Sequence, residues 1–326
     1  MDSSTAARTL VRWLTAALVL VVAPSEAAAY CFSSTCGEEQ PICVPSEGEP
    51  CGNVRHWMRD CVGYALQRNG TASLTLVEVA DAARAAFGAW TLAQCDTGDY
   101  PGIDVIEMGE VACNRKEFNP IAGNVNVVTF YDADWPYPKD SDALALTWVS
   151  FVPSTGEIVD ADIEVNTSSF TFSVSGTSTD YDLVGVLTHE VGHFFGMAHS
   201  LDQESTMRGD VLPGDTGLRS LMNDDVAGIC ALYPSKTIDY ATCNPIPLHG
   251  FASECEPDQY KGSCSAPAGR FPSEGAWEVI AAAIGLGMWL CRRTPGKARP
   301  KFVGGSRAMC EVEPQRAHRS CALSQP

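Results

Sequence analysis

The hydrophobic pattern in the middle of the chain predicts one amphipathic helix that packs on a sheet. Apolar side chains recur at helical spacing from Val79 to Trp90, so they lie along one side of a helix. Thr75 precedes this pattern, and Glu78 lies three residues after Thr75, which is the arrangement of a capping box. The spacing therefore predicts a helix over residues 75–90.

Four short runs rich in β-branched or aromatic residues follow this helix and predict strands. In chain order they cover residues 103–107, 124–131, 144–151 and 157–165. A Pro-Ser-Thr-Gly sequence at 153–156 predicts the turn of a hairpin between the last two runs. In the last run, alternation places Asp160, Asp162 and Glu164 on one face of the strand.

Residues 1–29 predict a secretory signal peptide. Arg8 and Arg12 precede an apolar run over 14–23, and alanines at 27–29 supply the small residues of a cleavage site. The sequence therefore predicts an exported protein, extracellular or located at the cell surface. Its fourteen cysteines fit that compartment, because disulfides persist in an oxidising environment.

The remaining segments divide the chain further. Residues 30–55 hold four cysteines among Ser, Pro, Gly and Glu, a composition that disulfides are expected to staple. A main domain is predicted over 56–236, and a cysteine-bearing linker over 237–275. An apolar run then covers 276–291, and a basic tail covers 292–326. The apolar run has sixteen residues, whereas a membrane-spanning helix needs about twenty, so it predicts a transient or a stable membrane attachment.

The charge is negative and unevenly distributed. The formal net charge is −18. Residues after 291 carry eight Lys or Arg against two Glu, a net charge of +6, so the preceding residues carry −24. Phosphate backbones repel so acidic a surface, which excludes nucleic acids as partners.

A His-Glu-Val-Gly-His run at 189–193 carries the most specific chemistry of the chain. On a helix, His189 and His193 lie one turn apart, so both imidazoles point from one face and can bind one ion. Gly196 can take the left-handed conformation that ends a helix, and the turn returns His199 as a third ligand. Three neutral nitrogens with an open fourth position predict a catalytic Zn²⁺ site.

Glu190 stands beside this open position and is the expected general base. Zinc lowers the pKa of a bound water to about 7 and polarises a carbonyl group. The carboxylate can take a proton from the water and deliver it to the leaving amine. The motif therefore predicts hydrolysis of peptide bonds in protein or peptide substrates.

The run from His189 to Ser200 resembles the signature of the metzincins and, through Ser200, of their matrixin branch. Matrixins have a methionine turn eight residues past the third histidine, where this chain has Met207. The stretch over 221–233 resembles the final helix of matrixins, whose paired aspartates brace that turn. The resemblance implies that Gly196 and Met207 support the metal site.

The resemblance also implies an α+β fold, with a twisted, mostly parallel mixed sheet and two helices above a smaller lower part. The methionine turn and the final helix form that lower part. In matrixins the strand at 144–151 is the sheet edge that holds the substrate as an added strand. Residues 211–219 would line the pocket for the side chain after the scissile bond. A monomer is expected.

Two further metal sites of matrixins lead to different expectations. Asp160, Asp162 and Glu164 offer oxygen ligands for Ca²⁺, but a solvated sheet face is the alternative, and the sequence favours it. The second, structural zinc of the family uses histidines between strands. Residues 120–170 contain none, so this site is expected to be absent.

Two cysteines carry separate hypotheses. The sequence around Cys43 weakly resembles the inhibitory pro-segment of matrixins, in which a cysteine keeps the enzyme latent. The two hypotheses for Cys43 are a latency switch and a structural disulfide, and the disulfide is favoured. Eleven cysteines lie from Cys31 to Cys264, so one cannot pair within the chain. The end of the chain resembles the sorting tails of myxobacterial surface proteins. That resemblance implies that Cys264 is modified or becomes the new C-terminus after removal of 276–326, and a retained anchor is the alternative.

A non-catalytic surface protein and a different type of metzincin are the alternatives to a matrixin-like peptidase. A disulfide-rich surface protein that binds or adheres without catalysis is the alternative from another class, but all three histidines and Glu190 are intact. Another metzincin branch, the astacin-like enzymes, would be supported by a tyrosine two residues after the turn methionine. Gly209 holds that position.

Overall fold

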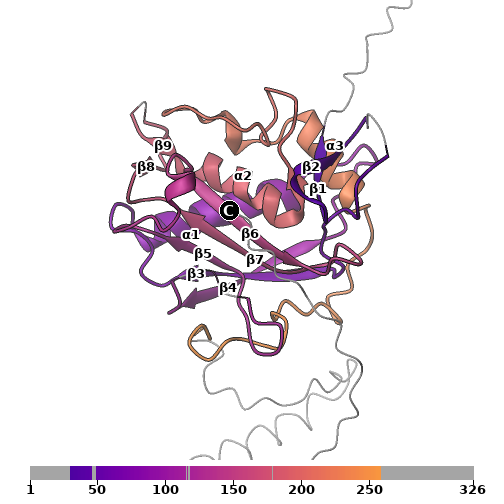
Figure 1. The fold of residues 1–326 in the computed structure, drawn as a ribbon, viewed down its shortest axis with the longest axis horizontal. Helices are drawn as coiled ribbons and strands as arrows, with labels where there is room; N and C mark the ends of the chain where they lie inside the picture. Colours follow the sequence, from indigo (N-terminus) through magenta and orange to yellow (C-terminus); the bar gives the residue numbers. More distant parts are fainter. Residues whose placement is uncertain (1–29, 46–48, 115, 117, 178, 258–326) are drawn as a thin grey trace, which may run out of the picture.

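The computed structural model describes residues 30–45, 49–114, 116, 118–177 and 179–257 (Figure 1). Within these residues the α-helices are α1 (Leu76–Thr91), α2 (Leu183–Phe195) and α3 (Asn223–Leu232). Short 3-10 helices are η1 (Pro138–Asp140) and η2 (Gly217–Arg219). The strands are β1 (Cys31–Ser34), β2 (Gly37–Cys43), β3 (Cys61–Gln67), β4 (Asp104–Val111), β5 (Val127–Phe130), β6 (Ala145–Phe151), β7 (Ile158–Val165), β8 (Phe172–Ser173), β9 (Tyr181–Asp182) and β10 (Met197–Ala198).

The central sheet has the strand order β4-β3-β5-β7-β6. Its first four strands run parallel, whereas β6 pairs antiparallel with β7 and forms an edge of the sheet. The predicted mostly parallel sheet, its edge strand and the hairpin between β6 and β7 are therefore confirmed. The four predicted strands correspond to β4, β5, β6 and β7, whereas β3 was not predicted.

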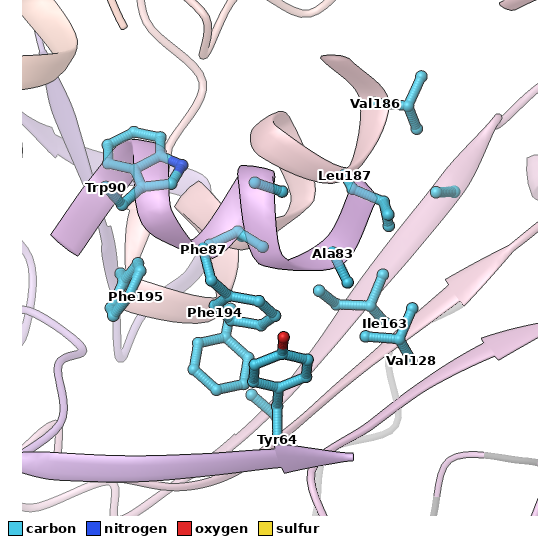
Figure 2. Close-up of a cluster of buried hydrophobic side chains, with 14 of the residues drawn as sticks. Tyr64, Ala83, Phe87, Trp90, Val128, Ile163, Val186, Leu187, Phe194 and Phe195 are labelled. Atoms are coloured by element: carbon cyan, nitrogen blue, oxygen red, sulfur yellow. The ribbon is translucent and has the colours of Figure 1, made fainter. Parts of the chain in front are cut away.

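Helices α1 and α2 pack together on one face of the sheet. Helix α1 begins as predicted, because Thr75 Oγ1 accepts from Glu78 N at 3.2 Å and the Glu78 carboxylate accepts from Thr75 N at 2.8 Å. Figure 2 shows the aromatic centre of the core below the helices. The ring of Phe87 stacks on Tyr64 with centroids 4.0 Å apart and meets Phe194 edge to face at 5.1 Å. This core holds α2, which carries the histidine motif, against α1 and the sheet.

The chain after α3 returns to the opposite face of the sheet, below the helices in Figure 1. Disulfides join Cys61 to Cys243 and Cys113 to Cys255. Cys255 packs in a second buried apolar cluster with side chains of β3, β4 and β5. The segment therefore covers a part of the sheet that would otherwise face solvent.

Strands β1 and β2 form an N-terminal β-hairpin that lies beside α3 (Figure 1). Strand β1 pairs antiparallel with β2 on one side and with β10 on the other. Disulfides join Cys31 to Cys43 and Cys36 to Cys51. The disulfide hypothesis for Cys43 is confirmed, and the latency hypothesis is wrong because the sulfur is already bonded.

A further disulfide links Cys95 to Cys230, so the five disulfides of the described residues use the ten cysteines from Cys31 to Cys255. The predictions for the signal peptide, Cys264, the apolar run and the basic tail lie outside the described residues. Within the described part of the chain, no helix has the length and apolar character needed to cross a membrane.

Candidate metal centre and active site

Helix α2 presents the predicted motif and ends where the sequence requires. Asp182 caps its N-terminus by accepting from Gly185 N at 2.8 Å. Gly196 ends it in the left-handed conformation, with φ 103°. A Cβ at Gly196 would lie 2.1 Å from the carbonyl oxygen of Arg55, so no side chain fits there. This turn starts the chain back toward the helix and delivers His199.

The three histidines converge through their Nε2 atoms. Nε2 of His189 lies 3.2 Å from Nε2 of His193 and 3.3 Å from Nε2 of His199. Nδ1 of His189 lies 2.8 Å from the carbonyl oxygen of Thr206, and Nδ1 of His193 lies 3.0 Å from that of Met197. Because a carbonyl only accepts, each of these Nδ1 atoms carries the proton, and each Nε2 keeps its lone pair for the common centre.

This arrangement fits a zinc ion by its donor chemistry. Burial lowers the pKa of His189 well below its ordinary value, which keeps the imidazole neutral. Among the described residues, the histidines are the only group of three His, Cys, Asp or Glu whose ligand atoms all lie within 4.8 Å of one another. Three neutral imidazoles are a ligand set that Zn²⁺ favours in catalytic sites.

Glu190 lies between α2 and the edge strand β6. Its side chain is 6% exposed, and Thr147 of β6 donates its hydroxyl to Glu190 Oε2 at 2.6 Å. The same hydroxyl lies 3.0 Å from the backbone oxygen of Glu190. One carboxylate oxygen is therefore tied to the sheet edge, which fixes the orientation of the predicted base beside the histidines.

Met207 packs against the helix that carries His189 and His193. It is fully buried, and a Cβ at Gly192 of α2 would lie 2.2 Å from its Sδ atom. The absence of a side chain at Gly192 therefore lets the methionine turn pack directly against the helix. Because Thr206 in the same turn holds His189 through its carbonyl oxygen, this packing also positions a histidine.

The paired aspartates of α3 brace this turn. Asp225 is completely buried and accepts from Ser205 Oγ at 2.5 Å, from Thr206 N at 2.8 Å and from Met207 N at 3.1 Å. Asp224 accepts from Ser200 Oγ at 2.6 Å. The two carboxylates thus connect the final helix to the methionine turn and to the residue after His199.

A cleft of about 480 Å³ runs over the histidines and Glu190. One wall is β6, whose outer edge pairs with no other strand among the described residues. Of the predicted pocket segment 211–219, Val211 and Leu218 line the cleft. The cleft therefore passes from the sheet edge to the segment that follows the methionine turn.

The acidic face of β7 is buried. Asp160, Asp162 and Glu164 are 2%, 1% and 0% exposed, so the expectation of a solvated face is wrong. Tyr131 donates its hydroxyl to Glu164 Oε1 at 2.6 Å, and Val127 N donates to Asp162 Oδ1 at 2.8 Å. Burial and the charge of Asp162 raise the pKa of Asp160 well above its ordinary value. Calcium binding by these residues stays a prediction.

The motif did not reveal every residue of the cleft. Thr147 was missed because alternation along a strand says which residues share a face but not which helix residue they meet. Ser33, Pro41 and Arg55 also line the cleft. They come from the N-terminal segment, more than a hundred residues from the motif, and no local spacing announces such a contact.

Comparisons with known proteins agree with this site. Residues 109–234 match the Matrixin family model, and this range runs from β4 to the residue after Tyr233 at the end of α3. The chain is 30% identical to neutrophil collagenase of Homo sapiens over 204 residues, which cover 60% of this chain and 38% of that protein. It is 28% identical to Metalloendoproteinase 1-MMP of Arabidopsis thaliana over 182 residues, which cover 54% of this chain and 44% of the relative.

These matches support a matrixin-like metzincin domain, and the α+β fold with its mixed sheet is the fold of such a domain. The chain spans about two fifths of the length of each of these two relatives, 38% and 44%. The matched range contains the edge strand, the histidine motif, the methionine turn and the final helix. The similarity therefore concerns the parts that build the site.

Proposed function

We propose that this protein is a zinc-dependent endopeptidase in which His189, His193 and His199 hold the metal and Glu190 is the general base. The observation that carries the proposal is the convergence of the three Nε2 atoms. In His189 and His193, the Nδ1 atom of the same ring is hydrogen-bonded to a backbone carbonyl oxygen. A zinc ion bound there would supply a Lewis acid that polarises the scissile carbonyl and acidifies a water. The similarity to metalloproteinases supports the same function.

Glu190 performs the proton transfers of this reaction. Its carboxylate takes a proton from the attacking water and delivers it to the nitrogen of the leaving amine. Thr147 holds Oε2 through its hydroxyl, so the side chain is oriented before the substrate arrives. Little motion of the base is then needed during the reaction, which lowers its barrier.

The substrate is a peptide segment in extended conformation. The outer edge of β6, which pairs with no strand in the described part of the chain, offers backbone N–H and C=O groups along the cleft, and a peptide that pairs with them becomes an added strand. Backbone pairing holds the scissile bond over the histidines, whereas side chains of the peptide meet the cleft walls. Substrate choice therefore depends on those walls.

Peptide hydrolysis by the zinc-loaded full chain tests the proposal. The protein is incubated with a peptide library and with a denatured substrate protein, in each case with and without a chelator. Zinc is then added back to the chelated samples. We expect cleavage that stops with the chelator and returns with zinc, at one zinc per chain by elemental analysis. A protein that binds one zinc but cleaves nothing would favour the non-catalytic surface protein instead.

We further propose that the protein is exported and that its C-terminal region is processed. The disulfides support export, since the five pairs need an oxidising compartment to form and persist. Mass spectrometry of the mature protein tests the fate of Cys264. A modified or C-terminal Cys264 without residues 276–326 supports sorting, and an ordinary disulfide with the tail attached supports a retained membrane anchor.

A further inference from the structure

We infer that the N-terminal hairpin of β1 and β2 is a wall of the substrate cleft and that Pro41 contacts an apolar side chain of the bound peptide. The inference rests on the proposed peptidase function and adds a specificity-determining residue to it. The hairpin lies past the last turn of α2, at the opposite end of the cleft from Leu218. It would act on one side of the scissile bond only.

The hairpin is attached to the backbone between two of the histidines. Ser33 N donates to the carbonyl oxygen of Gly196 at 2.8 Å, and Ser33 Oγ donates to the same oxygen at 2.9 Å. In the next residues, β1 pairs with β10, with Cys31 opposite Ala198. The backbone between His193 and His199 therefore pairs with the N-terminal segment. The hairpin packs directly against the turn that positions His199.

The residues that line the cleft separate into two ends along α2. Tyr181, Val186 and Leu218 lie near the first turns of the helix, where a Cβ at Gly185 would lie 3.1 Å from Leu218 Cβ. The other end lies past the last turn of the helix and includes Met197 and Ala198 of β10, which pair with β1. Ser33 and Pro41 belong to this second end.

The edge strand passes from one end to the other. Arg55 N donates to Ser33 O at 2.8 Å, and the Arg55 guanidinium lies 4.0 Å from the ring centroid of Phe151 at the end of β6. Thr147, beside Glu190, is at the middle of β6, and Val149 lines the cleft two residues closer to Phe151. At about 3.3 Å per residue, a peptide paired with β6 reaches the hairpin about two to four residues from the scissile bond.

Pro41 is the residue of the hairpin best placed to meet that peptide. It is exposed and lines the cleft. Its neighbours are fixed, because Ser34 Oγ donates to Gln40 O at 2.6 Å and the Cys31–Cys43 disulfide closes the hairpin two residues later. The partly buried Val149 and Ala198 line the same end of the cleft, so the chemistry there favours an apolar substrate side chain.

Opposite charges at Pro41 test the contact. Pro41→Glu and Pro41→Lys are each loaded with zinc and profiled on a peptide library that varies every position around the scissile bond. We expect both to lose the wild-type preference for an apolar residue at one position on one side of that bond. At the same position, Pro41→Glu should gain a two- to fivefold preference for Lys or Arg, and Pro41→Lys a similar preference for Asp or Glu, as expected for about 1 kcal/mol or less from an exposed ion pair.

A matched control is available in the same segment. Pro50 is also an exposed proline but does not line the cleft, so Pro50→Glu and Pro50→Lys should leave the profile unchanged. General damage to the hairpin would lower the rates of both Pro41 variants without producing opposite preferences. Unchanged or identical profiles for the two Pro41 variants would overturn the inference.

The inference is also testable apart from catalysis. Peptide binding by zinc-loaded Glu190→Gln protein, with and without the Pro41 substitutions, measures the same preferences when no bond is broken. Charge-dependent binding without wild-type hydrolysis would contradict the proposed function and leave the wall in place. If the wild type hydrolyses peptides but the Pro41 substitutions change neither assay, the hairpin is not a wall of the substrate cleft. The proposed function is then unaffected.

Discussion

At the scale of single residues, the orientation of Glu190 depends on one hydroxyl. Thr147 Oγ1 lies 2.6 Å from Oε2, and a hydrogen bond to a charged acceptor is stronger than one between neutral groups. Glu190 is nearly buried, so few water molecules could replace this donor. We therefore propose that Thr147 is a positioning residue that acts through Glu190, the proposed base.

Replacing Thr147 by Val tests this role. The variant keeps the β-branched shape but loses the hydroxyl, so we expect kcat to fall about ten- to a hundredfold while KM and zinc content stay unchanged. Thr147→Ser retains the hydroxyl and should recover most of kcat. Steady-state kinetics with elemental analysis decides this, and equal losses in both variants would show that the methyl group, rather than the hydroxyl, matters.

The carboxyl group of Asp160 is buried, and its pKa is well above the ordinary value because of burial and the charge of Asp162. Its raised pKa means that the folded protein binds a proton that the unfolded chain has already released. The associated stability is fully present below a pH of about 3.9 and is lost as pH rises toward and through the raised pKa. Asp160→Asn removes this titration.

We therefore expect Asp160→Asn to gain stability relative to the wild type as pH increases, by about 1.4 kcal/mol for each pKa unit of the shift. Urea unfolding at a series of pH values, with calcium chelated, measures the difference. A constant difference between the two proteins at every pH would contradict a protonated Asp160. A gain in wild-type stability on adding calcium that the variant lacks would instead support the calcium prediction.

At the scale of elements, the methionine turn depends on the final helix. Asp225 accepts hydrogen bonds from Ser205, Thr206 and Met207, and it also accepts from Met222 N at 2.9 Å. Because Asp225 is completely buried, its removal leaves several donors without a partner and without water.

Asp225→Ala should lower the free energy of unfolding by about 3 kcal/mol or more. It should also weaken zinc binding, because the Thr206 carbonyl that holds His189 lies in the same turn. Thermal unfolding and a zinc competition assay measure the two effects. The exposed Asp96 serves as the control, since Asp96→Ala removes a charge of the same sign from the surface and should change neither quantity. A stable variant with unchanged zinc affinity would contradict the bracing role.

Local signals predicted the elements that depend on local chemistry. Thr75 and Glu78 marked the start of α1, and Gly196 marked the end of α2, because caps and left-handed turns demand particular residues. β3 escaped prediction because all seven of its residues are buried on both faces, so the strand shows no alternation. The pairing of β1 with β10 depends on residues far apart in the chain, and no periodicity encodes it.

At the scale of the whole molecule, disulfides fix the segments that lie before and after the matched domain. Cys31–Cys43 closes the hairpin at one end of the cleft, and Cys61–Cys243 ties the segment after α3 to the sheet. The sequence indicated the three histidines that converge because His189 and His193 lie one turn apart on α2 and His199 follows shortly after the turn at Gly196. It did not predict the position of the hairpin beside the cleft or the burial of the acidic face, since both depend on which distant segment packs there.

The proposed hydrolysis divides the chemistry between three histidines that hold zinc and Glu190 that moves the proton. The decisive measurement is the rate of peptide hydrolysis by Glu190→Gln protein that has been shown to contain one zinc per chain. The glutamine keeps the shape of the side chain but cannot take a proton from water, so we expect loss of nearly all activity with zinc retained. Substantial hydrolysis by this zinc-loaded variant would contradict Glu190 as the base, and loss of zinc together with activity would contradict a metal site built by the histidines alone.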